Sequence, residues 1–302
     1  MKKYLIYLGE RFPLQTHIPI IAIFSFSAIC YSLSANQVTS FVPVSYYLAA
    51  FFLTFTLFLL LRISDEFKDH EEDMMYRKYL PVPRGLVTLE ELRRIAYIIL
   101  SLQVVVIFYY PGFLPIYVAT LVYMAFMYNE FFVDEWLRKR QVAYVFSHML
   151  IIPLVDLVAS SAHWSMEGIA PPRALMWFFA VSFFNGILLE VGRKIKPLEH
   201  EEEGVVSYTK LWGTKRAVFI WLTILLVTLA LAALAAKAID SPNWVYILLV
   251  VFGLASALST LAFLRKPSLK AAKYIENASG LWTMGMYLNL GALPFLFENI
   301  VN

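Results

Sequence analysis

Three aspartates spaced four residues apart stand between two long apolar stretches. Asp65, Asp69 and Asp73 lie in the segment RISDEFKDHEEDMMYRKYLPVPRG, residues 62–85. On a helix, each step of four turns the side chain by about 400°, so the three carboxylates share one face over about 12 Å. Such stacked like charges destabilise a bare helix, and a hard divalent cation would offset the repulsion. We therefore expect these aspartates to be catalytic, binding Mg²⁺ together with phosphate oxygens of a substrate.

Basic residues in and next to this segment are candidates for holding the phosphates. Lys68, Arg77, Lys78 and Arg84 all lie within it. Charge-assisted hydrogen bonds from such side chains to phosphate oxygens are strong, and arginine can make two at once. From this group we expect Lys68, Arg77 and Arg84 to bind a diphosphate.

A second charged stretch covers residues 187–213. Glu190, Arg193 and Lys194 share a helix face by their spacing of three and four, and Pro197 ends or bends that helix. A metal–diphosphate site needs acids for the ion and cations for the remaining phosphate charge. We expect Glu190 to act in catalysis and in metal binding, and Arg193 and Lys194 to bind diphosphate. A solvated loop with self-compensating charges is the alternative.

Four acids follow Pro197, at positions 199 and 201–203. Of these, Glu199 and Glu203 are the expected further metal ligands. Asn185 precedes Glu190 within an apolar stretch, where polar groups usually face the bundle interior. We expect Asn185 to contact the ligand or a neighbouring helix, and Tyr208 to contact the diphosphate or to fix the entry of the next helix.

The composition indicates a membrane protein. The chain has 302 residues, of which 60% are hydrophobic and 16% are charged. Soluble domains carry about 25% charged residues. Apolar stretches near the roughly 20 residues needed to cross a bilayer predict an all-α bundle of about nine transmembrane helices around a central cavity, in a single domain over residues 1–302. The expected spans are 17–36, 41–63, 95–111, 113–132, 143–162, 174–190, 215–237, 243–264 and 279–300.

The distribution of basic residues predicts the orientation. With the N-terminus in the cytoplasm, all but two of the 25 lysines and arginines fall in cytoplasmic segments, the exceptions being Arg173 and Lys237. This bias follows the positive-inside rule. The two long charged loops, about 64–94 and 191–214, are then both cytoplasmic. We expect the active site at the cytoplasmic side of a multi-pass protein of a bacterial inner membrane.

The two acidic motifs after the second and sixth spans, with the nine spans, resemble the UbiA superfamily of intramembrane prenyltransferases over the whole chain. The family's first motif, N/D-x3-D-x3-D, is matched by Asp65, Asp69 and Asp73. An Arg-Pro and Gly stretch commonly follows it; here Leu80 replaces the arginine, and Arg77 or Arg84 stands in. In the second motif, Lys194 occupies a position where another acid is often found.

The resemblance implies a Mg²⁺-dependent enzyme. It would ionise an isoprenyl diphosphate and transfer the prenyl group to an aromatic, quinone-precursor or other lipophilic acceptor, with membrane lipid around it and no nucleic-acid partner. Two alternatives stay open. A UbiA-type membrane terpene cyclase would ionise the same substrate and quench the cation internally. An anion transporter would carry its charges near the bilayer midplane, whereas here they cluster in loops.

Overall fold

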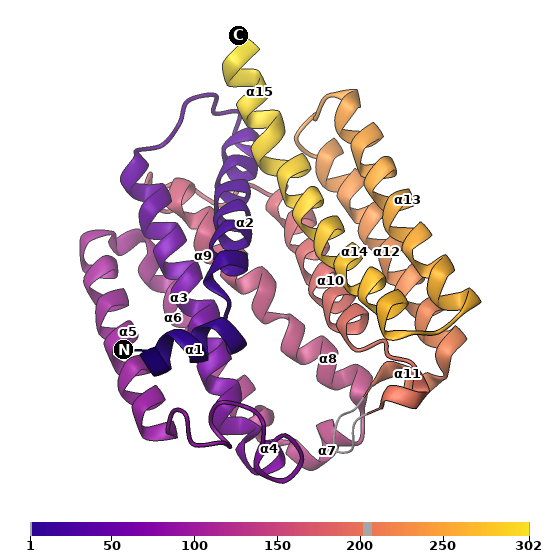
Figure 1. Ribbon diagram of the computed structural model, residues 1–302. Helices are drawn as coiled ribbons and strands as arrows, with labels where there is room; N and C mark the ends of the chain where they lie inside the picture. Colours follow the sequence, from indigo (N-terminus) through magenta and orange to yellow (C-terminus); the bar gives the residue numbers. More distant parts are fainter. Residues whose placement is uncertain (1, 202–206, 302) are drawn as a thin grey trace.

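The computed structural model describes residues 2–201 and 207–301, and this part of the chain is helical without strands. Two groups of long helices stand side by side, α2, α3, α5 and α6 in one and α10, α12, α13 and α14 in the other (Figure 1). The α-helices are α1 Lys2–Arg11, α2 Leu14–Ala35, α3 Val44–Lys68, α4 His70–Tyr76, α5 Leu89–Tyr109, α6 Leu114–Tyr128, α7 Asp134–Arg138, α8 Gln141–Met149, α9 Ile151–Trp164, α10 Leu175–Arg193, α11 Tyr208–Trp212, α12 Thr214–Lys237, α13 Asn243–Arg265, α14 Leu269–Tyr287 and α15 Leu293–Val301. Short turns of other helix types are η1 Pro111–Phe113, η2 Glu130–Phe132, η3 Leu198–His200 and the π-helix η4 Leu288–Ala292.

Eight stretches among the described residues are long and apolar enough to cross a membrane, and they match the first eight expected spans. The expected ninth span falls in a helical run over residues 269–301, in which the π-helix η4 joins α14 to α15. The all-α membrane fold is thus confirmed. The count of nine crossings stays a prediction.

The fifth span is broken by a proline. Helix α8 ends at Met149 and α9 begins at Ile151. Because Pro153 has no N–H, it cannot donate to the carbonyl of Met149 four residues earlier, and its ring crowds that carbonyl. The break separates the polar first half of the span, which carries Tyr144 and His148, from the buried second half.

A buried polar cluster joins α9, α10 and α14. Asp156 is fully buried and accepts hydrogen bonds from the hydroxyls of Ser182 and Tyr287, the latter at 2.7 Å. An acid within a membrane span is expensive unless it is partnered in this way. Asp156 therefore links three helices and lies outside the charged pocket described below.

Close packing between α2 and η4 depends on Gly291. A Cβ at this position would lie 2.1 Å from the carbonyl oxygen of Ser27. Since small residues allow such close backbone approach in membrane bundles, a larger residue must push the two helices apart. We expect Gly291→Ala to destabilise the protein by about 1–3 kcal/mol, measured as thermal unfolding in detergent.

The matched control is Gly280→Ala in α14, where no atom lies within 4 Å of the added Cβ. This variant should unfold at or slightly above the wild-type temperature, because alanine favours a helix more than glycine does. Equal unfolding temperatures for the two variants would show that the α2–η4 contact does not limit stability.

Candidate active site

A charged pocket of about 630 Å³ lies at the end of the bundle where α3 continues into α4. Figure 1 shows α4, α7 and α11 gathered at this end, away from α15. The lining of the charged pocket combines seven cationic and five acidic residues with three neutral ones: Arg11, Arg62, Asp65, Phe67, Lys68, Asp69, Glu71, Glu72, Arg77, Glu130, Arg138, Gln141, Tyr144, Arg193 and Lys194. Residues of the two sequence motifs, more than 120 positions apart, therefore meet in one cavity.

The first motif is helical on both sides of Asp69, but the helix is interrupted at that residue, since α3 ends at Lys68 and α4 begins at His70. The backbone hydrogen bonds continue across this break. The backbone N–H of Asp69 donates to the carbonyl of Asp65 at 2.9 Å, and that of Asp73 donates to Asp69 at 2.8 Å. Asp65 and Asp69 line the charged pocket. Arg62 lies 3.5 Å from the Asp65 carboxylate. Two carboxylates of the motif are thus available at the cavity.

Asp73 lies behind this pair. Its side chain is 2% exposed and forms an ion pair at 2.8 Å with Arg77, which does line the pocket. Burial raises the pKa of the Asp73 carboxyl, and the Arg77 guanidinium only partly opposes this. To bind a metal, Asp73 would have to exchange Arg77 for the ion. Its role as a ligand stays a prediction.

Two buried glutamates each hold a pair of cations at the pocket. Glu66 on α3 accepts from Arg11 at 2.6 Å and from Arg62 at 3.0 Å. Glu190 on α10 accepts from Arg193 Nε and lies 2.7 Å from Lys194 Nζ. Because a buried carboxylate needs such partners, each glutamate fixes two cations in place. The structure thus places Arg193 and Lys194 at the pocket, with Glu190 behind them.

Lys68 belongs to a further polar cluster at the pocket wall. Its ammonium lies 2.6 Å from Glu130, 3.0 Å from the Tyr144 hydroxyl and 2.9 Å from His148 Nε2. Glu130 begins three consecutive residues with positive φ, from 49° to 59°. Such backbone is costly for non-glycine residues and persists only where the surroundings hold it. The turn after α6 thus brings Glu130 to Lys68.

Glu130 gives a pH-dependent contribution to stability. Burial opposes its ionisation, but hydrogen bonds from His148 and Lys68 outweigh burial and lower the pKa of Glu130 below its ordinary value. The stabilisation is then complete above about pH 4.5 and is lost as the pH falls through the lower folded-state pKa. We expect Glu130→Gln to lower the unfolding temperature at pH 7, and the difference from the wild-type temperature to shrink as the pH falls.

Glu135→Gln is the control, because Glu135 is exposed on α7. A difference between Glu130→Gln and wild type that did not change with pH would contradict this assignment.

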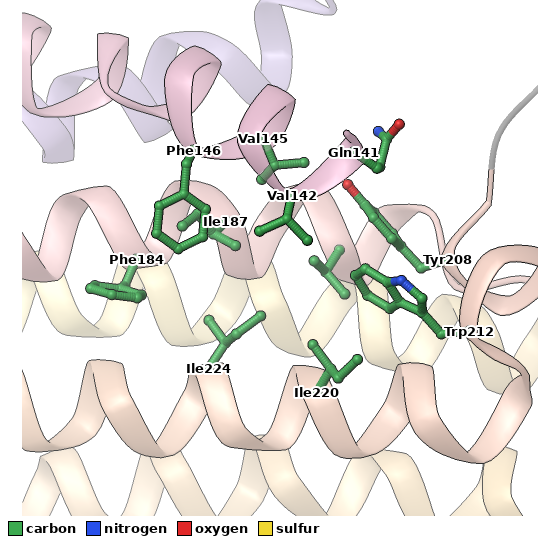
Figure 2. Close-up of a pocket in the computed structure, with 11 residues that line it drawn as sticks. Gln141, Val142, Val145, Phe146, Phe184, Ile187, Tyr208, Trp212, Ile220 and Ile224 are labelled. Carbon is green, nitrogen blue, oxygen red and sulfur yellow. The ribbon is translucent and has the colours of Figure 1, made fainter. Parts of the chain in front are cut away.

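Other predicted site residues lie elsewhere. Arg84 is bonded on the surface to Glu10, at 2.7 and 2.9 Å, and Asn185 is buried and accepts from Trp282 Nε1 at 2.9 Å. Glu199 is exposed in η3, and Glu203 lies outside the described residues. Tyr208 is buried, packs against the tilted ring of Trp212 and lines an apolar pocket (Figure 2). None of these described residues lines the charged pocket, so their expected contacts with diphosphate or metal stay predictions.

The sequence of the chain matches one protein family over most of its length. The family model described as "UbiA prenyltransferase family" matches residues 21–284. The chain belongs to the UbiA prenyltransferase family. It is an integral membrane protein, as the family and the apolar helices together show. The predicted resemblance to the UbiA superfamily is thereby confirmed at the level of the family.

The chain is also similar to two individual proteins. It is 26% identical to the diterpene cyclase eriG of Hericium erinaceus over 154 residues, which is 47% of this chain and 48% of that protein. The chain therefore matches about half the length of this curated relative. A solved structure described as digeranylgeranylglyceryl phosphate synthase in membranes aligns over 100% of both chains with a TM-score of 0.63 and 18% identity. That likeness supports the fold.

UbiA family members generally use a divalent metal, and the donor set here fits one. Mg²⁺ binds through one or two carboxylates plus substrate phosphates and water, which is what Asp65 and Asp69 would leave room for. No cluster of three or more acids, histidines or cysteines placed to hold an ion occurs among residues 2–201 and 207–301. Asp65 and Asp69 fit a metal that takes its remaining oxygen ligands from a diphosphate and from water.

Several pocket residues were missed at the sequence level. Arg11 comes from the N-terminal helix, Arg138 follows the fourth span and Tyr144 lies at the start of the fifth, so only tertiary structure brings them to the cavity. Arg62 did carry a signal, because it precedes Asp65 by three residues and Glu66 by four. Glu66 itself was overlooked because it falls between the spaced aspartates.

Proposed function

We propose that this UbiA family member is a Mg²⁺-dependent prenyltransferase that ionises an isoprenyl diphosphate and transfers the prenyl group to an aromatic or other lipophilic acceptor. The observation that carries the proposal is the meeting of Asp65 and Asp69 with Arg193 and Lys194 at one cavity, next to membrane-spanning helices. A diphosphate needs this combination of metal-binding acids and cations.

The reaction begins when the allylic C–O bond breaks and its electron pair leaves with the diphosphate. Negative charge grows on the leaving group, so Arg193, Lys194 and Lys68 stabilise the transition state more than the bound substrate. The π electrons of an aromatic acceptor then form the new C–C bond, and the ring proton is lost. When bound at Asp65 and Asp69, Mg²⁺ would supply further charge neutralisation to the leaving group.

Glu66 and Glu190 serve this chemistry indirectly. Each keeps two cations pointed at the cavity, so we assign Glu190 a positioning role for Arg193 and Lys194. Arg77 lines the cavity while paired with Asp73 and is the remaining candidate for the arginine that Leu80 replaces.

A membrane terpene cyclase is the second candidate function. The similarity to a diterpene cyclase over about half the chain favours it. In a cyclase the cation would be attacked by a double bond of its own chain and would finally lose a proton or gain water. The charged pocket would do the same work in both reactions, since both start by ionising a prenyl diphosphate. The two functions differ in whether an external acceptor is needed.

The experiment uses purified protein in lipid nanodiscs with C10, C15 and C20 isoprenyl diphosphates, with Mg²⁺ or with EDTA. Diphosphate is quantified, and lipid extracts are analysed by mass. We expect Mg²⁺-dependent release that requires an added aromatic or lipophilic acceptor and yields a prenylated acceptor. Release without acceptor, with a cyclic hydrocarbon or alcohol as product, would assign the cyclase. Absence of release under all conditions would overturn both.

The proposal includes the remaining sequence-based expectations. We infer a single domain over residues 1–302 and a cytoplasmic active site in a bacterial inner membrane. The placement of basic residues supports this orientation, because the charged pocket contains many of them. Accessibility of a single cysteine introduced at exposed Glu72 to a membrane-impermeant reagent, in whole cells and in inverted vesicles, tests the sidedness.

A further inference from the structure

The connection between α6 and α8 carries large apolar side chains on its surface. It covers residues 129–140 and includes η2 and α7. Phe132 is 74% exposed and Trp136 is 48% exposed. Since the connection joins two membrane-spanning stretches, Pro111–Tyr128 and Gln141–Trp164, it lies where the bundle leaves the bilayer. Exposed aromatic side chains at this level are typical of the membrane–water interface.

The strained turn η2 directs two neighbouring aromatic residues to opposite sides. The ring of Phe131 packs inward, with its centroid 5.5 Å from that of Tyr123 and 5.9 Å from that of His148. The ring of Phe132 points outward and lies 6.1 Å from the ring of Phe126, which is itself exposed. Both residues of the turn have positive φ, of 54° and 59°. Because such backbone persists only where its surroundings hold it, the turn keeps Phe132 away from the bundle interior.

Two basic residues follow directly after α7. Lys139 and Arg140 are exposed, and neither forms an ion pair with any residue that the structure describes. Arg138, in contrast, is paired with two acids. The Arg140 guanidinium lies 4.6 Å from the centre of the Trp136 ring, which is a cation–π distance. Two cations without acidic partners therefore stand beside the exposed aromatic side chains.

Arg140 also borders a surface hollow of about 640 Å³ at the start of α8. Of the described residues in the lining of this hollow, Arg140 alone is charged. Val142, Phe146 and Trp212 supply apolar side chains to it (Figure 2). A hollow that combines one cation with apolar walls fits a molecule with an anionic head and a hydrocarbon chain.

We propose that the connection over residues 129–140 binds an anionic phospholipid of the surrounding bilayer. Lys139 and Arg140 bind the phosphate of the headgroup, and Phe132 and Trp136 enter the interface beside it. Basic residues next to a bilayer attract anionic headgroups, and exposed aromatic residues add buried apolar area. A zwitterionic headgroup fits less well, because it would bring a cation of its own next to two cations that lack acidic partners.

This lipid site adjoins the charged pocket. Glu130, at the start of the connection, and Arg138, directly before the two cations, both line that pocket. Figure 1 shows α7 at the same end of the bundle as α4. A bound phospholipid therefore restrains a segment that contributes two side chains to the charged pocket. The lipid site itself does not depend on the proposed function.

The experiment is native mass spectrometry of the delipidated full chain in detergent, titrated with phosphatidylglycerol or with phosphatidylcholine of identical acyl chains. We expect wild type to bind one phosphatidylglycerol with a Kd at least about tenfold lower than that for phosphatidylcholine. The double variant Lys139→Gln/Arg140→Gln should lose this preference, because each basic residue near a membrane surface contributes about fivefold to the binding of anionic lipid. Thermal unfolding in detergent verifies that the variant is folded.

The matched control is the double variant Lys266→Gln/Lys270→Gln. It removes two exposed basic residues from the junction of α13 and α14 and should leave the lipid preference unchanged. An equal loss of preference in both double variants would show a diffuse attraction to the basic face and would overturn the inference. Equal Kd values for the two lipids in wild type would overturn it as well.

Competition with a prenyl diphosphate separates the phospholipid from the donor as the occupant. We expect phosphatidylglycerol to stay bound when an unreactive C15 prenyl thiodiphosphate is added, so that one complex carries both molecules. Displacement of the phosphatidylglycerol by the thiodiphosphate would assign the hollow to the donor and overturn the inference. If the thiodiphosphate did not bind at all, that result would count against the proposed function, and the lipid preference of the variants would still decide the lipid site.

Discussion

Replacing Asp69 by Asn is expected to reduce diphosphate release by about 10²–10³-fold while the protein remains folded. Asp69 is the capping residue after α3, is half-buried and lines the charged pocket. The amide keeps the size of the side chain but removes the charge that a divalent cation requires. Release is measured with saturating donor and Mg²⁺, and folding is followed by thermal unfolding in detergent.

The control for this substitution is Glu90→Gln. Glu90 lies on α5 outside the charged pocket, its side chain is 54% exposed, and it pairs with Arg93 at 3.0 Å. Surface pairs of this kind contribute little, so the variant should release diphosphate at nearly the wild-type rate. If Asp69→Asn retained wild-type turnover, the pocket's aspartates would have no essential part in ionisation.

Replacing Arg193 or Lys194 by Ala is expected to raise KM for the prenyl donor by about tenfold or more. A hydrogen bond to a charged group contributes about 1.5–3 kcal/mol, and each factor of ten corresponds to about 1.4 kcal/mol. Because these contacts strengthen as the leaving group gains charge, kcat should fall as well. Steady-state kinetics over a range of donor concentrations separates the two effects.

Arg84→Ala is the informative comparison. Its guanidinium is paired with Glu10 away from the pocket, although its position in the first motif predicted a diphosphate contact. We expect the KM of the Arg84→Ala variant for the prenyl donor to stay within about twofold of the wild-type value, because an exposed ion pair contributes little. The reverse result, with a raised KM in Arg84→Ala and unchanged values in the Arg193 and Lys194 variants, would place the diphosphate elsewhere.

Local sequence patterns were sufficient for the fold and for part of the site. The lengths of the apolar stretches predicted the membrane-spanning helices. The four-residue spacing of the aspartates predicted that the segment around them is helical. The spacing alone did not show that Asp73 turns to Arg77 while Asp65 and Asp69 face the cavity. That difference depends on which groups pack behind the helix, and a periodic pattern carries no such information.

The second motif illustrates the same limit. Its i, i+3, i+4 spacing correctly placed Glu190, Arg193 and Lys194 on one face, but the buried acid binds the two cations next to it. Glu66 does the same for Arg62 and for Arg11, which lies 55 residues earlier in the chain. The strained turn that presents Glu130 to Lys68 has no glycine signature, because the positive φ values fall on Glu130, Phe131 and Phe132.

The most direct test of the central claim is an experimental structure with Mn²⁺ and an unreactive prenyl thiodiphosphate. Manganese replaces magnesium at oxygen sites and can be located by its anomalous scattering. We expect the metal beside Asp65 and Asp69, and the diphosphate between it and the cations Arg193 and Lys194. A diphosphate bound outside the charged pocket, or a metal bound without either aspartate, would contradict the account.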